Sequence, residues 1–254
     1  AHAPAYSQQA VIGTFIHVPY MTSFAFTARA LSLLMSVVTV LLVNRLTSLV
    51  AGPLAGLLAA AACALDGGLV YYGQVTNLDG PYLFWAVLSL WAWMRFLIAG
   101  DIRSLRWAAL SAAAAIATKD QAYAVFLLTL PASFLLSLAL DPAARRRFPA
   151  LVLPMLRWAS ISLGLLLLVD GAITNPSGFA RRMAFLRGPA SQDYMAHTSD
   201  ITGRVRLMAA MIAHFPRLYP PAIALSLVAG PGLAWPSPPA QPAPRVAGLV
   251  AALA

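Results

Sequence analysis

Residues 71–81 read Tyr-Tyr-Gly-Gln-Val-Thr-Asn-Leu-Asp-Gly-Pro and separate two apolar runs, each long enough to cross a lipid bilayer. A membrane-spanning helix needs about 20 predominantly apolar residues. The stretch places an amide, Asn77, and a carboxylate, Asp79, in a short turn between the two runs. A carboxylate there can cap the next helix, with Pro81 in its first turn, or it can serve in binding or catalysis. The residues of the turn leave both roles open.

The composition of the 254-residue chain is that of a membrane protein. Hydrophobic residues make up 60% and charged residues 10%, whereas soluble domains carry about 25% charged residues. The mean hydropathy is +0.76. The formal net charge is +9, but the basic residues form short clusters between apolar runs, which is how membrane topology is encoded. We therefore expect no nucleic-acid partner, and the single cysteine excludes a disulfide framework.

Apolar runs separated by polar turns predict an all-α bundle of about seven membrane spans plus a partial eighth. A long polar segment follows the sixth run, and apolar residues recur at helical spacing over 204–218, which predicts a helix lying on the membrane surface. The expected spans cover roughly residues 22–43, 49–72, 82–99, 107–118, 121–140, 151–169 and 219–235. We divide the chain into the tail of an external loop, a six-helix core, a long external loop and truncated C-terminal spans, at residues 1–21, 22–170, 171–218 and 219–254.

Arginines in the short loops predict the orientation of the bundle, because basic loops stay in the cytoplasm. The arginines that share one side are Arg45, Arg103, Arg106, Arg145, Arg146, Arg147 and Arg245. The opposite side then carries the Asn77–Asp79 turn, the Lys119–Asp120 pair and the long loop at 171–218. We expect a multi-pass protein of the cell membrane whose active face is external, which is the periplasmic side in a Gram-negative cell.

Several polar groups on the predicted external side are candidates for chemistry. Lys119 is the only lysine of the chain; it can bind a phosphate, shift the pKa of a neighbouring carboxylate or anchor a helix at the interface. Arg29 lies inside the first predicted span, where an arginine either has a function or extends to the interface. Arginines of the long loop suit bidentate phosphate binding, or they are simply solvated. The candidate site residues are Arg29, Asn77, Asp79, Lys119, Asp120, Gln121, Arg181, Arg182 and His197.

Short motifs form an ordered set over nearly the whole chain. They are TARALS at 27–32, GPLAGLLAA at 52–60, VYYG at 70–73, NLD at 77–79, ATKDQA at 117–122, NPSGF at 175–179 and GPASQ at 188–192. In this order and spacing the set resembles the membrane-embedded glycosyltransferases of the GT-C superfamily. It is most similar to the bacterial relatives of dolichyl-phosphate-mannose protein mannosyltransferases and of the aminoarabinose transferase that modifies lipid A.

This resemblance implies an enzyme that moves a sugar from a polyprenyl-phosphate carrier to a lipid, glycan or protein acceptor outside the membrane. It implies that Asp79 is an acidic group near the carrier phosphate and near any bound divalent cation; no cofactor is certain. It also implies a general base in the first external loop, but no Asp or Glu precedes Asp66. The chain starts without Met and stops inside an apolar run, so we expect a piece of a longer protein whose base is missing here. Two other functions stay open: a secondary transporter of a small or anionic solute, and a non-catalytic membrane subunit.

Overall fold

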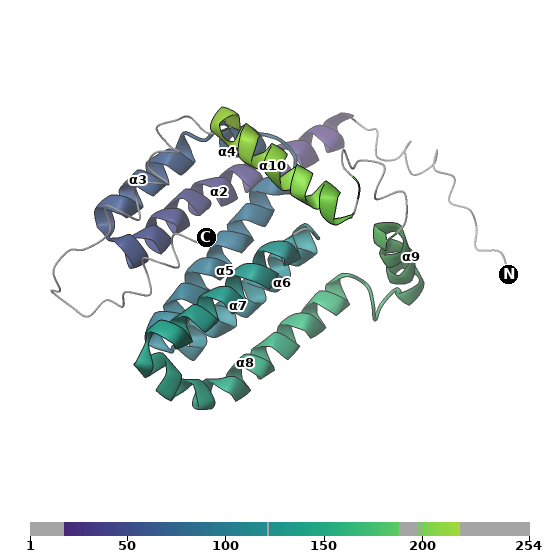
Figure 1. Cartoon of the computed structure of the whole chain (residues 1–254). Coiled ribbons are helices and arrows are strands. Elements are labelled where there is room, and N and C mark those ends of the chain that lie inside the picture. The colour runs from purple at the N-terminus through teal and green to yellow at the C-terminus, as the bar shows by residue number, and fades with distance from the viewer. Residues whose placement is uncertain (1–17, 121, 188–197, 199, 219–254) are drawn as a thin grey trace.

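The computed structural model describes residues 18–120, 122–187, 198 and 200–218. These residues form helices joined by turns, with no strand among them, which confirms the predicted all-α class (Figure 1). In chain order the helices are α2 (Val18–Ala51), α3 (Pro53–Ala64), α4 (Gly67–Gln74), α5 (Asp79–Ala99), α6 (Ile102–Thr118), α7 (Ala122–Leu140), α8 (Pro142–Val169), α9 (Pro176–Arg187) and α10 (Ile201–Leu218).

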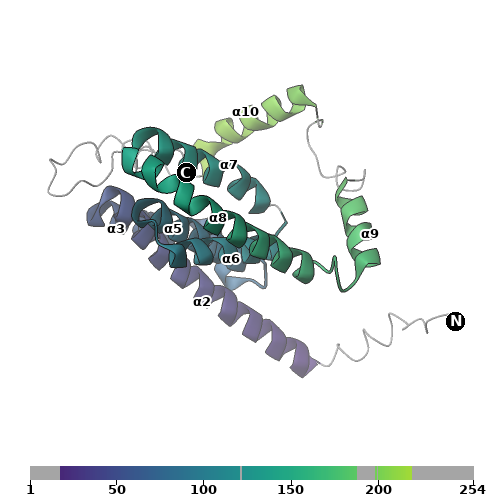
Figure 2. The ribbon, with the colours of Figure 1, turned by 90° about the horizontal axis from the view of Figure 1, so that it is seen from below.

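The first helix, α2, is longer than the span predicted at 22–43. It continues through Arg45, where the span was expected to end, and has 34 residues. At 1.5 Å per residue it is about 50 Å long, whereas the hydrocarbon core of a bilayer is about 30 Å thick. Figure 2 shows its N-terminal part projecting beyond the rest of the bundle. The helix stops at Gly52, whose φ of 91° favours glycine, and Pro53 starts α3.

The second predicted span, 49–72, is two helices and not one. α3 and α4 are bent by 58° relative to each other. At the break, Asp66 Oδ1 accepts a hydrogen bond of 2.8 Å from the Leu69 N–H and caps α4. This bond explains how the bundle accommodates a carboxylate between two apolar segments.

Helices α5 to α8 run alternately up and down and are joined by buried polar contacts. Ser89 Oγ donates to the Ala108 carbonyl oxygen at 2.8 Å and links α5 to α6. Trp93 Nε1 donates to Ser133 Oγ at 2.8 Å and links α5 to α7, while Ser162 Oγ links α8 to α6. Such bonds hold helices together where the surrounding lipid is as apolar as the side chains. The core between them contains Ala92, Trp93, Phe96, Leu105 and Ala108.

The number of membrane spans is confirmed only in part. Within the described residues, four helices are long and apolar enough to cross a membrane (α2, α5, α7 and α8), and α3 with α4 makes a fifth if the bent pair is one span. α6 has 17 residues, fewer than the usual span of about 20. The spans predicted at 219–235 and from 246 onward lie outside the described residues.

Several segments that were predicted as loops are helical. α8 starts at Pro142, about nine residues before the predicted span, so Arg145 lies in its first turns and not in a loop. The Arg145 side chain donates to the carbonyl oxygens of Leu138 and Ala139, at 2.6 and 2.8 Å, and so satisfies the end of α7. α9 was not predicted at all. Asn175 starts it by accepting a hydrogen bond of 3.1 Å from the Gly178 N–H.

The amphipathic helix predicted at 204–218 is confirmed as a helix, α10. It begins three residues earlier than expected, because Asp200 accepts a hydrogen bond of 2.8 Å from the Gly203 N–H and caps it. Its large apolar side chains whose burial is described are exposed, among them Val205, Met208 and Ile212. Placement on a membrane surface stays a prediction.

Candidate functional site

The Asn77–Asp79 turn starts α5. The Asp79 side chain does not cap this helix, although a cap was one of its two predicted roles. The N-cap position is Leu78, and no side chain caps it. Asp79 is the first residue of the helix, where the positive end of the helix dipole favours a negative charge. Within the turn, Asn77 Nδ2 donates to Asp79 Oδ2 at 2.9 Å, and the Leu78 N–H donates to Asn77 Oδ1 at 2.6 Å. The turn therefore fixes the carboxylate and leaves its other oxygen for a partner.

Small residues hold this turn against α2. Ser32 Oγ donates to the Asn77 carbonyl oxygen at 3.5 Å. A Cβ added at Gly73 would lie 3.0 Å from Ser36 Oγ, and one added at Gly80 would lie 3.3 Å from it. Ser36 is buried, and its hydroxyl has no hydrogen-bond partner within the described residues. Larger side chains at either glycine would push α4 or α5 away from α2.

Asp79 forms an ion pair with Lys119 across the open end of a helix hairpin. α5 and α6 are antiparallel and joined through Gly100, so that the start of α5 meets the end of α6. Lys119 Nζ contacts Asp79 Oδ1 and lies 5.9 Å from the centroid of the Tyr82 ring. Lys119 is the C-cap of α6, where the helix dipole favours a cation. The ammonium has three N–H donors, of which Asp79 engages one.

A second set of ion pairs involves the residue that follows Lys119 in the sequence. Arg182 of α9 donates from Nη1 to Asp170 Oδ1 at 3.1 Å, and its Nη2 contacts Asp120 Oδ1. Asp120 follows Lys119, and Asp170 is the C-cap of α8. The side chains of Asp79, Lys119, Asp120, Asp170 and Arg182 are called the five-residue network below. It joins the ends of α5, α6 and α8 to α9, at one end of the bundle.

The five-residue network carries an excess of negative charge. Three carboxylates face two cations, which leaves one uncompensated negative charge. Arg29 is a further cation on the neighbouring part of α2. This exposed residue lies one turn before Ser32 on α2, and residues three apart are neighbours on a helix surface. Because Ser32 contacts Asn77, this part of α2 lies at the same end of the bundle as the network.

The structure brings together most, but not all, of the residues that the sequence singled out. The predicted residues that meet are Asn77, Asp79, Lys119, Asp120 and Arg182. Arg181 is exposed on α9 and takes no part in the network. Gln121 and His197 lie outside the described residues. Asp170 was missed, although a carboxylate at the end of an apolar run is a usable signal: the helix dipole opposes it there, so that it needs a cation.

The divalent cation that the resemblance places near Asp79 stays a prediction. Within the described residues, no group of three or more His, Cys, Asp or Glu side chains lies close enough together to hold a metal ion. Asp79 and Asp120 instead face Lys119 and Arg182.

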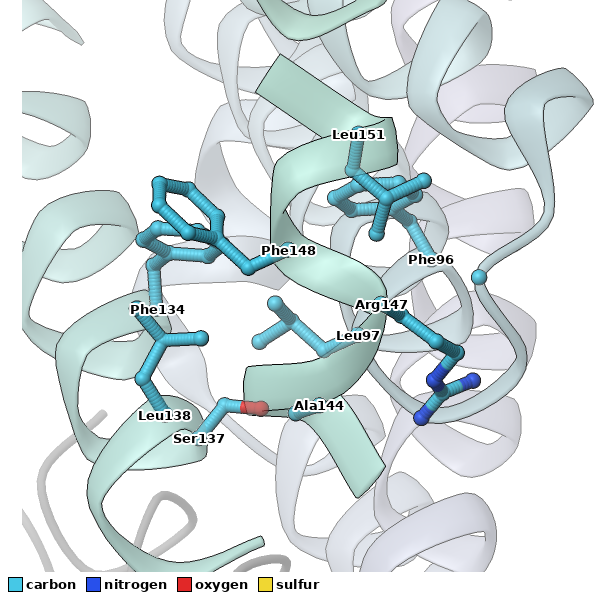
Figure 3. A pocket seen from close by; sticks show the side chains of 10 residues that line it. Phe96, Leu97, Phe134, Ser137, Leu138, Ala144, Arg147, Phe148 and Leu151 are labelled. Atoms are coloured by element: carbon cyan, nitrogen blue, oxygen red, sulfur yellow. The ribbon is translucent and has the colours of Figure 1, made fainter. Parts of the chain in front are cut away.

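A cavity at the opposite end of the bundle does not compete as a ligand site. It has a volume of about 20 Å³ and lies between the ends of α5, α7 and α8 (Figure 3). The rings of Phe134 and Phe148, with centroids 5.4 Å apart, form one wall, and Arg147 and Phe96 also line it. This volume suffices for about one water molecule.

No protein-family model, curated protein or solved structure matches the chain. Its function is therefore argued from the chemistry of the five-residue network and from the order of the sequence motifs. The network holds a lysine whose ammonium has further N–H donors for an anion at one end of an apolar bundle.

Proposed function

We propose that the chain belongs to a membrane glycosyltransferase that moves a sugar from a polyprenyl-phosphate carrier to an acceptor hydroxyl or amine. The observation that carries the proposal is the five-residue network: it gathers four of the candidate site residues, far apart in sequence, at one end of an apolar bundle. A carrier lipid has the matching shape, with an apolar tail for the bundle and a phosphate for the cations.

The proposed arrangement in the membrane follows from the charges at the two ends of the bundle. Arg103, Arg106 and the arginines at 145–147 lie at the end opposite to Asp79, so that end is cytoplasmic and the network faces outward. The full arrangement has about seven spans plus a partial eighth, with α10 lying on the external membrane surface. A carrier lipid then places its phosphate level with the network.

The transfer reaction builds up charge on the leaving phosphate. The acceptor oxygen or nitrogen attacks the anomeric carbon in line, the bond from that carbon to the phosphate oxygen breaks, and its electron pair stays on the phosphate. The phosphodiester with one negative charge becomes a phosphate monoester with two. Lys119 offers the phosphate its N–H donors that Asp79 does not use, and Arg29 lies at the same end of the bundle. Fixed cations of this kind stabilise the transition state more than the ground state.

Asp79 acts in this proposal by positioning Lys119 and not as the general base. Its two oxygens are engaged by Asn77 and Lys119, and these contacts hold the carboxylate against the lysine. The resemblance assigns the base to an aspartate in the first external loop.

The proposal is tested with the Asp79→Asn variant of the full-length protein, supplied with a polyprenyl-phosphate sugar and an acceptor. The asparagine keeps the shape of the side chain but loses the charge that orients Lys119. We expect turnover to fall about tenfold or more, and about a hundredfold or more in Lys119→Met. The control is Asp101→Asn at the opposite end of the bundle, which should keep wild-type turnover. Wild-type turnover in Asp79→Asn would remove Asp79 from the site.

One observation favours a second candidate function, that of a secondary transporter. The 58° bend between α3 and α4, with Asp66 at the break, resembles the interrupted helices that form transport sites. Uptake of a labelled anionic solute into proteoliposomes, without any transfer of sugar from the carrier, would establish this function and exclude the glycosyltransferase.

A further inference from the structure

Arg182 is the polar bridge between α9 and the bundle. Its guanidinium reaches Asp170, which lies 12 residues earlier, and Asp120, which lies 62 residues earlier. The two carboxylates belong to different elements, one at the end of α8 and the other between α6 and α7. A planar guanidinium can serve two carboxylates at once, whereas a lysine offers only a point charge.

Apolar packing contributes little to the position of α9. Over 176–186, the residues of this helix whose burial is described, no side chain is buried. Phe185 and Leu186, the large apolar residues near its end, are 57% and 41% exposed. Within the described residues, the ion pairs of Arg182 therefore tie α9 to the bundle.

The position of Asp170 in the fold is unfavourable for an unpaired negative charge. The residue is the C-cap of α8, where the negative end of the helix dipole opposes a carboxylate. Its side chain is only 12% exposed, so water solvates the charge poorly. A carboxylate in this position needs a nearby cation, and Arg182 supplies it. The two charges thus hold each other in the folded protein.

We propose that Arg182 is a latch: its bridge to Asp120 and Asp170 keeps α9 docked on the bundle, and its release lets α9 move away from the end of α8. Arg182 is then a structural residue and not a ligand of substrate. The latch is coupled to the candidate site through neighbouring residues, because Lys119 holds Asp79 and the next residue, Asp120, holds Arg182. The inference concerns the docking of α9 and does not depend on sugar transfer.

The latch is tested by measuring the distance between spin labels on α9 and α8 in the full-length protein in lipid nanodiscs. Cys63 is first replaced by Ala, and labels are attached to cysteines at the exposed positions Ala180 and Leu163. We expect one narrow distance distribution in the otherwise unchanged protein. In Arg182→Gln and in Asp170→Asn, the ratio of docked to released α9 should fall about tenfold, because each change removes a charged hydrogen bond.

The matched control is Arg181→Gln, which removes the same charge one position away on the same helix and should keep the narrow distribution. The double variant Arg182→Gln/Asp170→Asn should be no more released than Arg182→Gln, because both changes break one bridge. A pair of labels within α8, at Leu153 and Leu163, reports whether the bundle is folded. If Arg182→Gln changes the distance between these two labels, the test rests on the isosteric variant Asp170→Asn. A narrow, wild-type distribution in Asp170→Asn would overturn the latch, as would equal release in Arg181→Gln.

Discussion

The ion pair between Asp79 and Lys119 is expected to stabilise the folded bundle by about 1–2 kcal/mol. Two unit charges 4 Å apart attract by about 4 kcal/mol at an effective dielectric constant of 20. The lost hydration offsets part of this attraction, since the two side chains are only 23% and 35% exposed. An exposed ion pair contributes about 0–1 kcal/mol and a charged hydrogen bond about 1.5–3 kcal/mol. The stabilisation expected for this pair therefore lies above the first range and at the lower end of the second.

A double-mutant cycle measures this coupling directly. The variants are Asp79→Asn, Lys119→Met and the two together, each unfolded at equilibrium in mixed micelles. Each single variant should lose about 1–2 kcal/mol of unfolding free energy, or about 2–8 °C in Tm, and the double variant should lose no more than the worse single one. Arg103→Gln, the loss of an exposed cation at the other end of the bundle, should stay within about 0.5 kcal/mol of wild type. A coupling free energy of zero would refute the reasoning.

Three further outcomes follow from the packing and the caps. Gly73→Ala should destabilise the bundle by about 1–3 kcal/mol through the clash with Ser36 Oγ, and Ser36→Ala should restore most of the loss in equilibrium unfolding. Trp93→Phe should cost about 1 kcal/mol in the same measurement, because it removes the 2.8 Å hydrogen bond to Ser133. The pKa of Asp101 lies below its usual value, because a backbone N–H and a hydroxyl at the start of α6 donate to its carboxylate. The ionised Asp101 therefore stabilises the folded protein fully above the pKa of about 3.9 that an aspartate has in the unfolded chain. This stabilisation is lost as the pH falls through the lower pKa of Asp101 in the folded protein. Asp101→Asn should flatten the Tm profile in that acidic range.

The start and end of α5 could be predicted from the sequence because local signals mark both. The Asn77–Asp79 turn precedes the helix, and Gly100, with a φ of 69°, ends it as a left-handed cap. The start of α8 could have been predicted in the same way: Asp141 caps it and Pro142 follows. A helix start of this kind depends on a few adjacent residues, so the local sequence is enough to predict it.

The end of α2 was placed wrongly because a charge marks depth in a membrane and not the end of a helix. Arg45 can extend its side chain to the interface while its backbone stays helical. The helix ends only at Gly52, where the backbone adopts a conformation that favours glycine. The break at Asp66 was missed for a related reason: the apolar run on both sides looks like one span, but a capping carboxylate followed by Gly67 starts a new helix.

The members of the site could be predicted, but their pairing could not. Lys119 and Asp79 were singled out because charges are rare in this chain and both lie at span ends. That the lysine would hold the carboxylate, and that Arg182 would bridge Asp120 and Asp170, depends on how helices pack across 62 residues of chain. A local sequence pattern cannot predict contacts between residues so far apart in the chain.

The most direct test of the proposed function is the fate of a labelled polyprenyl-phosphate sugar in proteoliposomes that contain the full-length wild-type protein and an acceptor. Free polyprenyl phosphate is expected to appear together with labelled acceptor, one for one, and both should fall together in Lys119→Met. Intact donor after prolonged incubation, with labelled solute taken up instead, would contradict the proposed function.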